Sequence, residues 1–179
     1  MATLLKLSAM IDRMTEGVGR ALSWLILVMV LISALNAVAR KFLNASSNSW
    51  LELQWYLFSV VFLCCAGYAL LRKEHIRIDI IASHLSERAN QRIALFGHVF
   101  FLVPLCLIML YFSWPYFMES VRINEHSSNA GGLVRWPAKL TILVGFSLLL
   151  LQGISEIIKQ VGEMRGVYVD PRTPPASSH

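Results

Sequence analysis

Four long apolar stretches constrain the fold of this chain more than any other feature of its sequence. A helix rises about 1.5 Å per residue, so about twenty residues cross the hydrocarbon core of a bilayer, which is about 30 Å thick. Each stretch is long enough, and together they predict transmembrane helices over residues 21–39, 50–71, 93–118 and 137–158. Because the connections are short, we expect one all-α integral membrane domain over residues 1–165.

The composition agrees with a membrane protein and argues against two other classes. Of the 179 residues, 56% are apolar and 15% are charged, whereas soluble domains carry about 25% charged residues. The formal charge of +5 does not indicate nucleic-acid binding, because the basic residues flank the apolar stretches and form no patch. Cys64, Cys65 and Cys106 lie inside predicted spans, so neither a disulfide framework nor a thiol relay is indicated.

The distribution of Lys and Arg predicts the orientation. Short cytoplasmic loops of membrane proteins are enriched in these residues. Of the 16 in this chain, eleven lie before the first span, between the second and third spans, or after the fourth, and five lie on the opposite side. We therefore expect both termini in the cytoplasm.

Two segments outside the spans carry predictions of their own. The connection after the second span places Ile81 and Leu85 four residues apart among polar neighbours, so a short interfacial helix with Asp79 as its N-cap is expected there. Residues 166–179 are rich in Pro and Ser and lack periodicity, which is typical of a disordered tail.

The centres of the four spans are apolar. They fall near Met29, Val60, Leu105 and Ser147, and Ser59 and Ser147 are the small polar groups among Leu, Ile, Val, Met, Phe and Cys. Transporters usually place ionisable or strongly polar groups at this depth, because ions need partners that replace water. The chain is therefore expected to be unfit to translocate a solute alone.

Ionisable residues inside the spans lie near their ends. Glu52 and Lys139 are expected at the outer face, and His98 and Glu156 toward the inner face. Glu52 could bind a cation or could be an anchor or a paired charge, and at interfacial depth an anchor or paired charge is favoured. Because Arg40 lies at similar depth, an Arg40–Glu52 ion pair is our hypothesis; independent solvation of both head groups is the alternative.

Other chemistry has less support in the sequence. A haem held inside a four-helix bundle needs axial ligands on facing helices, and His98 is the one histidine within a span. We expect no cofactor and no metal. The connection over 119–136 is expected to be an outward-facing loop, solvated or docking a partner. Pro104 is expected to bend the third span, and Gly145 and Gly153 to allow close helix approach.

Three short patterns, together with the four spans, carry a family resemblance. They are Asn36-x-x-x-Arg40, Trp50-x-Glu52 and, just after the second span, His75-x-Arg77-x-Asp79. In this order they resemble the small membrane subunit of tripartite ATP-independent periplasmic (TRAP) transporters, the DctQ-like family. The His-x-Arg-x-Asp element is the most specific of the three.

The resemblance implies a non-catalytic, multi-pass subunit in a bacterial inner membrane. Its implied partners are a large membrane permease subunit, a periplasmic solute-binding protein that delivers organic acids or related solutes, and the lipid bilayer. Transport in this family is driven by a sodium gradient, and the large subunit holds the substrate and sodium sites. The residues of the three patterns are then candidates for subunit or lipid contacts: Asn36, Arg40, Trp50, Glu52, His75, Arg77 and Asp79.

Two other functions remain open from the sequence. One is a membrane anchor of a redox enzyme that binds haem or quinone through intramembrane histidines. The other is an autonomous small exporter with Glu52 as its coupling residue.

Overall fold

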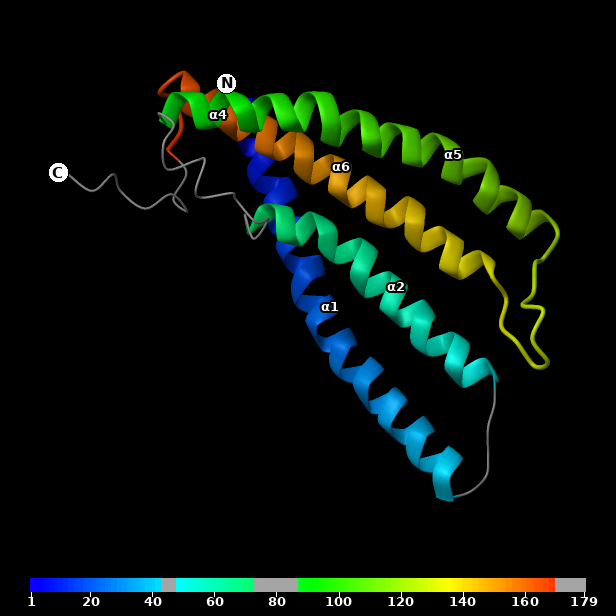
Figure 1. The fold of residues 1–179 in the computed structure, drawn as a ribbon. Helices are drawn as coiled ribbons and strands as arrows, with labels where there is room; N and C mark the ends of the chain where they lie inside the picture. The colour runs from blue at the N-terminus through cyan, green and yellow to red at the C-terminus, as the bar shows by residue number, and fades with distance from the viewer. Residues whose placement is uncertain (43–47, 73–86, 170–179) are drawn as a thin grey trace.

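The structure, a computed structural model, describes residues 1–42, 48–72 and 87–169. Its helices are α1 (Ala2–Phe42), α2 (Asn48–Leu71), α4 (Glu87–Gly97), α5 (Val103–Arg122) and α6 (Trp136–Met164), and a π-helical turn, η1 (His98–Leu102), joins α4 to α5 (Figure 1). In this described part, four helical segments are long and apolar enough to cross a membrane. The predicted fold class is confirmed, and each predicted span lies inside one of these segments.

The first helix is much longer than its predicted span. It begins at Ala2 and not at Ala21, and its 41 residues correspond to about 62 Å of helix, twice the thickness of a hydrocarbon core. The interfacial helix expected from Asp79 lies outside the described residues, as does most of the tail expected from residue 166.

The helices form an open layer and not a closed bundle (Figure 1). Helix α6 packs against α5 on one side and α2 on the other, and α1 packs against α2. The first half of α1 also contacts α6, and the buried residues of α1 all lie between Ser8 and Leu22. We call the end with the N-terminus the terminal end, and the end with the α5–α6 connection the loop end. Toward the loop end α1 diverges from the other helices.

Glycines set the close approach of α6 to its neighbours. A Cβ atom built on Gly145 would lie 2.7 Å from the Cβ of Leu63 and 2.9 Å from its backbone oxygen, so α2 and α6 nearly touch backbone to backbone. Gly153 faces Leu102 in the same way, where a Cβ would meet a side-chain carbon at 2.7 Å. Inside lipid there is no hydrophobic driving force between helices. Small residues at a helix interface allow dense van der Waals contact, which stabilises the packing instead.

The third membrane segment is one long helix with a widened turn. The amide of Val103 donates to the carbonyl of His98, five residues back, and Pro104 follows at the start of α5. Proline has no amide hydrogen to donate, which explains why the regular hydrogen-bonding pattern gives way beside it. The structure thus has a π-helical turn just before Pro104, where the sequence predicts a bend.

Replacing Gly145 by alanine tests the close packing of α2 and α6. The added methyl group would displace the backbone of α2, so Gly145→Ala is expected to lower the free energy of unfolding by about 1–3 kcal/mol. Reversible unfolding of the purified protein, followed by circular dichroism, measures the change. Gly17→Ala is the control: nothing lies within 4 Å of its Cβ position, so no loss is expected. Equal stability of both variants would contradict the packing.

Candidate functional site

Glu52 lies in the second turn of α2 and is buried, with 2% of its surface exposed. Its carboxylate accepts hydrogen bonds from the Ser127 hydroxyl, from Asn129 Nδ2 at 2.9 Å and from the backbone amide of Leu133 at 2.6 Å. All three donors belong to the connection between α5 and α6. A buried carboxylate is tolerated when its oxygens are fully hydrogen-bonded, and here one loop supplies the donors.

The loop over residues 123–135 folds back on itself. The amide of Ser127 donates to the carbonyl of Leu133 at 2.9 Å, and the amide of Arg135 donates to the carbonyl of Glu125 at 2.8 Å. The reversal passes through Gly131, whose φ of +71° lies in the left-handed region that favours glycine. The loop is therefore a short hairpin whose inner side presents its hydrogen-bond donors to Glu52.

Three further contacts fix this hairpin on α2. Asn48 Nδ2 donates to the carbonyl of Ala130 at 3.0 Å, the Ser49 hydroxyl donates to the carbonyl of Gly131, and the Tyr56 hydroxyl donates to the carbonyl of Val134 at 3.2 Å. These donors occupy the first three turns of α2 together with Glu52. The loop, expected from the sequence as a solvated or docking connector, is a structured cap on the loop end of α2.

Charged residues tie the base of the hairpin to α6. Lys139 Nζ donates to the Glu125 carboxylate and lies 3.7 Å from the centre of the Tyr116 ring, and Arg135 lies 3.9 Å from the same carboxylate. The hydrogen bond from Lys139 holds the pKa of the Glu125 carboxyl below its ordinary range. Glu125 therefore stays ionised at neutral pH and links the loop to the first turn of α6.

The hypothesis of an Arg40–Glu52 pair is wrong. Arg40 is exposed near the end of α1, and among the described residues no ion pair joins it to Glu52, whose oxygens are taken by the loop. The divergence of α1 explains the error, because equal depth in the membrane did not bring the two helices together. Hydrogen-bond donors of the loop take the place of the expected cation at Glu52.

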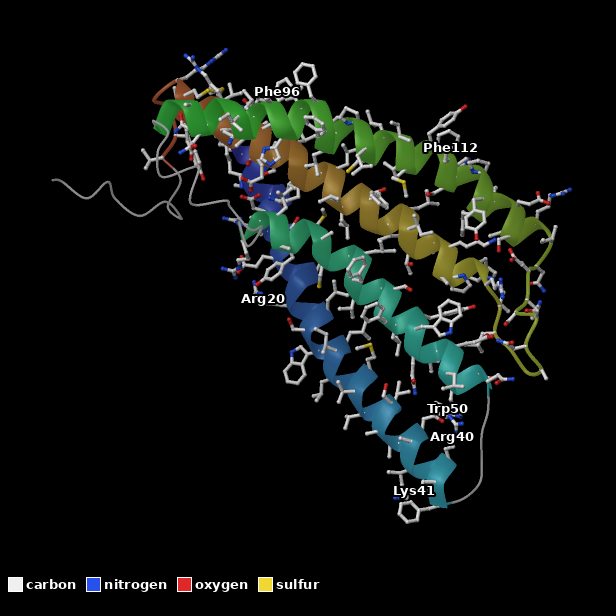
Figure 2. All side chains as sticks on the ribbon, viewed as in Figure 1. Arg20, Arg40, Lys41, Trp50, Phe96 and Phe112 are labelled. Carbon is white, nitrogen blue, oxygen red and sulfur yellow. The ribbon has the colours of Figure 1, made fainter. Side chains whose placement is uncertain are left out.

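Of the remaining sequence candidates, the structure describes Asn36 and Trp50. Asn36 is half-buried on α1, and Trp50 is half exposed on the first turn of α2, on the loop end with Arg40 (Figure 2). His75, Arg77 and Asp79 lie outside the described residues. Their roles stay predictions.

A second polar site, at the terminal end, was not expected from the sequence. Asp12 of α1 accepts hydrogen bonds from Gln152 at 3.0 Å and Ser155 at 2.7 Å, and pairs with Lys159 at 2.9 Å. Lys159 is 3% exposed and also pairs with Glu156 at 2.5 Å. We call Ser8, Asp12, Gln152, Ser155, Glu156 and Lys159 the terminal cluster.

The terminal cluster joins the first half of α1 to the last turns of α6. Ser8 and Ser155 share a hydrogen bond of 2.7 Å between their hydroxyl groups, one turn of α1 away from Asp12. A signal was present, because Ser8, Asp12 and Thr15 recur at helical spacing and lie on one face. The predicted span begins only at residue 21, so this face lies before the part of α1 that hydrophobicity marks.

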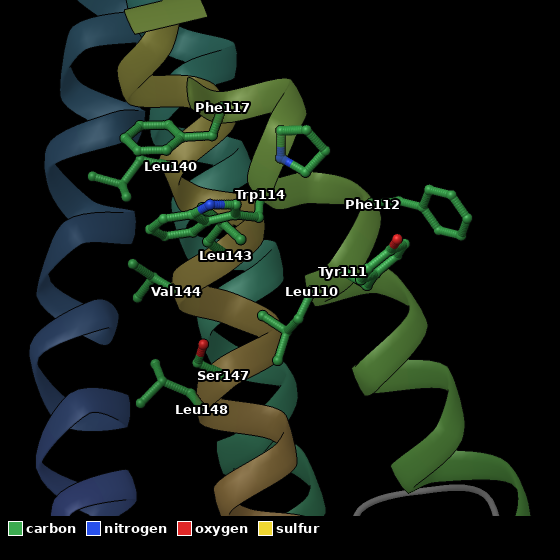
Figure 3. A pocket seen from close by; sticks show the side chains of 11 residues that line it. Leu110, Tyr111, Phe112, Trp114, Phe117, Leu140, Leu143, Val144, Ser147 and Leu148 are labelled. Carbon is green, nitrogen blue, oxygen red and sulfur yellow. The ribbon is translucent and has the colours of Figure 1, made fainter. Parts of the chain in front are cut away.

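An apolar groove runs between α5 and α6 (Figure 3). Its volume is about 940 Å³, and its walls include Trp114 and Phe117 of α5 and Leu143, Val144 and Leu148 of α6. Ser147 is a small polar group in this wall, and no charged residue of the described part of the chain lines it. An organic acid would need a cation or several donors to replace its hydration, so the groove suits apolar groups.

Comparison with protein families gives a match over residues 29–163 to the family described as "Tripartite ATP-independent periplasmic transporters, DctQ component". The match begins inside α1 and continues through α2, α4 and α5 to the last turn of α6. The chain belongs to the DctQ family. The resemblance seen in the sequence is thereby confirmed, and this DctQ component is a small, multi-pass membrane subunit of a TRAP transporter. Comparisons with curated proteins and with solved structures give no match.

Removing the charge of Glu52 tests its role as the anchor of the hairpin in this DctQ component. Glu52→Gln keeps the size of the side chain but turns an amide donor toward groups that are themselves donors. Amide hydrogen exchange at Ser127 and Leu133 is expected to speed up by a factor of about 10–100, from a loss of about 1–3 kcal/mol. Glu119→Gln is the control, because that carboxylate is exposed and pairs with Arg122 at the surface. Unchanged loop protection in Glu52→Gln would contradict the anchor.

A double-mutant cycle tests the terminal cluster. Lys159→Met leaves two carboxylates without their shared cation and is expected to cost about 3–5 kcal/mol of unfolding free energy. Asp12→Asn together with Lys159→Met is expected to cost clearly less than the sum of the two single changes. In the double variant the Asp12 carboxylate, which Lys159→Met alone would leave unpaired, is no longer present. Additive losses would show that Asp12 and Lys159 act independently. Glu16→Gln, on the half-exposed Glu16–Arg72 pair, is expected to change stability by less than about 1 kcal/mol.

Proposed function

We propose that this chain is the non-catalytic small subunit of a sodium-driven tripartite transporter, and that it braces a large permease subunit. The permease takes up organic acids or related solutes, which a periplasmic solute-binding protein delivers. The protein lies in a bacterial inner membrane with both termini in the cytoplasm, so the loop end faces the periplasm. Membership of the DctQ family supports the transporter role directly.

The observation that carries the bracing role is the open layer of helices. A closed bundle would bury one side of each helix in a common core, whereas this layer exposes large apolar side chains such as Trp24, Phe62 and Phe112 on its surfaces. Its described polar clusters, the hairpin anchored by Glu52 and the terminal cluster, lie at the two ends. A layer with polar ends and apolar faces is suited to be a wall against which another membrane protein packs.

A transporter in which one part moves across the membrane needs another part that stays fixed. Wide apolar faces and interfacial side chains resist displacement from the bilayer, and Trp50 and Trp136 lie in the first turns of α2 and α6, at the loop end where such anchoring acts. The family resemblance assigns the substrate and sodium sites to the large subunit. An apolar groove between α5 and α6 agrees with a subunit that binds no solute itself.

The hairpin is the part of the chain best placed to meet the solute-binding protein. Glu52 and the first turns of α2 hold it in one conformation, which lowers the entropy lost when a partner docks. His75, Arg77 and Asp79 belong to the opposite side in the predicted topology. We propose that they contact the large subunit or lipid there.

Reconstitution tests the proposed function. The large permease of the same tripartite system is expected to co-purify with the tagged chain, and sodium-driven uptake in proteoliposomes is expected to need both membrane subunits and the binding protein. Replacing His75, Arg77 and Asp79 by alanine is expected to reduce co-purification, while Gly17→Ala, at an uncrowded position, is not. Uptake or export by this chain alone, or a Soret band in its absorption spectrum, would overturn the proposal.

A further inference from the structure

The first half of α1, residues 2–20, has one covered side and one open side. The covered side packs on α6 and α2 through Ser8, Ile11, Thr15 and Gly19, all of them buried. The open side carries an apolar stripe at helical spacing, in which Leu4 is 47%, Leu7 42%, Met10 63% and Met14 42% exposed. A water-soluble helix usually turns its apolar side inward, whereas here small polar side chains such as Ser8 and Thr15 are buried and an apolar stripe is exposed.

Three basic residues flank this apolar stripe. Lys6, Arg13 and Arg20 recur every seven residues, which is two helical turns, so they form a row along one side of α1. All three side chains are exposed, and none takes part in an ion pair within the described part of the chain (Figure 2 labels Arg20). Their charges are therefore available to an external anion.

The acidic residues of the same segment are already engaged by other helices. Asp12 pairs with Lys159 of α6 at 2.9 Å, and Glu16 pairs with Arg72, just past the end of α2, at 3.2 Å. The segment contains no other Asp or Glu. The open side thus presents a row of positive charge beside an apolar stripe.

We propose that residues 2–20 form an interfacial anchor that binds anionic phospholipid. The apolar stripe lies against acyl chains, and Lys6, Arg13 and Arg20 extend along the surface to the phosphate groups. Length supports this placement: about 20 residues of α1 suffice to span the core, and the preceding 19 continue for about 28 Å beyond it. A helix held upright in water would leave the apolar stripe hydrated, whereas a tilted helix at the interface covers it.

The anchor accounts for the polar packing on the covered side. At the membrane surface, the side of the helix that faces α6 has no lipid contact, so hydrogen bonds such as Ser8–Ser155 can form its interface. The occupant of the open side is identified by charge complementarity, since an anionic headgroup joined to acyl chains matches a cationic row beside an apolar stripe.

Lipid selectivity of the purified full-length chain tests the proposal. The protein is reconstituted in phosphatidylcholine bilayers that contain spin-labelled phosphatidylglycerol or spin-labelled phosphatidylcholine, and the motionally restricted fraction of each lipid is measured. The wild type is expected to prefer phosphatidylglycerol. In K6Q/R13Q/R20Q the preference is expected to fall, by up to about fivefold for each charge removed at low salt. The charge-conserving K6R/R13K/R20K variant is expected to retain it.

Two controls keep the test decisive. Circular dichroism verifies that the variants keep their helix content. A nitroxide on Met10→Cys, corrected for labelling of the native cysteines, is expected to be more accessible to oxygen, which enriches in lipid, than to a water-soluble nickel chelate. Unchanged lipid preference in K6Q/R13Q/R20Q would overturn the proposal. Greater accessibility of the Met10→Cys nitroxide to the nickel chelate than to oxygen would also overturn it. So would loss of a bound protein partner from K6Q/R13Q/R20Q without any change in lipid preference.

Discussion

Helices inside a bilayer gain no hydrophobic free energy by leaving lipid for one another, and this constraint governs the whole structure. Association must come from close contact and from hydrogen bonds that lipid does not offer. The chain meets the first need with glycines on α6, where Gly145 brings that helix against the backbone of α2. It meets the second at the two ends of the layer, where Glu52 and Asp12 accept hydrogen bonds from other parts of the chain.

The two polar sites do different structural work. Glu52 accepts bonds from a loop and so determines the conformation of residues that meet the aqueous phase. Asp12 accepts bonds from a neighbouring helix and so determines how α1 docks on α6. Between the sites the contacts are apolar, which leaves the faces of the layer free for protein or lipid. A bracing subunit needs both properties, because its own contacts must fix its ends while its apolar faces stay available to pack against protein or lipid.

The number and position of the spans were predictable because hydrophobicity and length alone decide them. The lateral arrangement was not, since an Arg40–Glu52 pair required α1 and α2 to stay together at the loop end, and no residue pattern reports that they diverge. The position of Glu52 near the end of its span was predictable from the sequence. The hydrogen-bond donors of Glu52 were not predictable, because a backbone amide such as that of Leu133 is present in almost every residue and no sequence pattern identifies it. The role of Asp12 was not predicted, because the sequence pattern that extends a helix ahead of an apolar stretch is much weaker than the hydrophobicity of the stretch itself.

The terminal cluster has a consequence for how the chain is made. Asp12 and its partners on α6 are separated by 140 to 147 residues, so the ribosome completes the fourth span long after the first has entered the membrane. Until then the Asp12 carboxylate has to remain hydrated, which holds the beginning of α1 at the water-facing boundary and away from the lipid interior. The last turns of α6 then close a contact with one of the first segments synthesised. The last contact formed during insertion therefore lies at the terminal end, where insertion began.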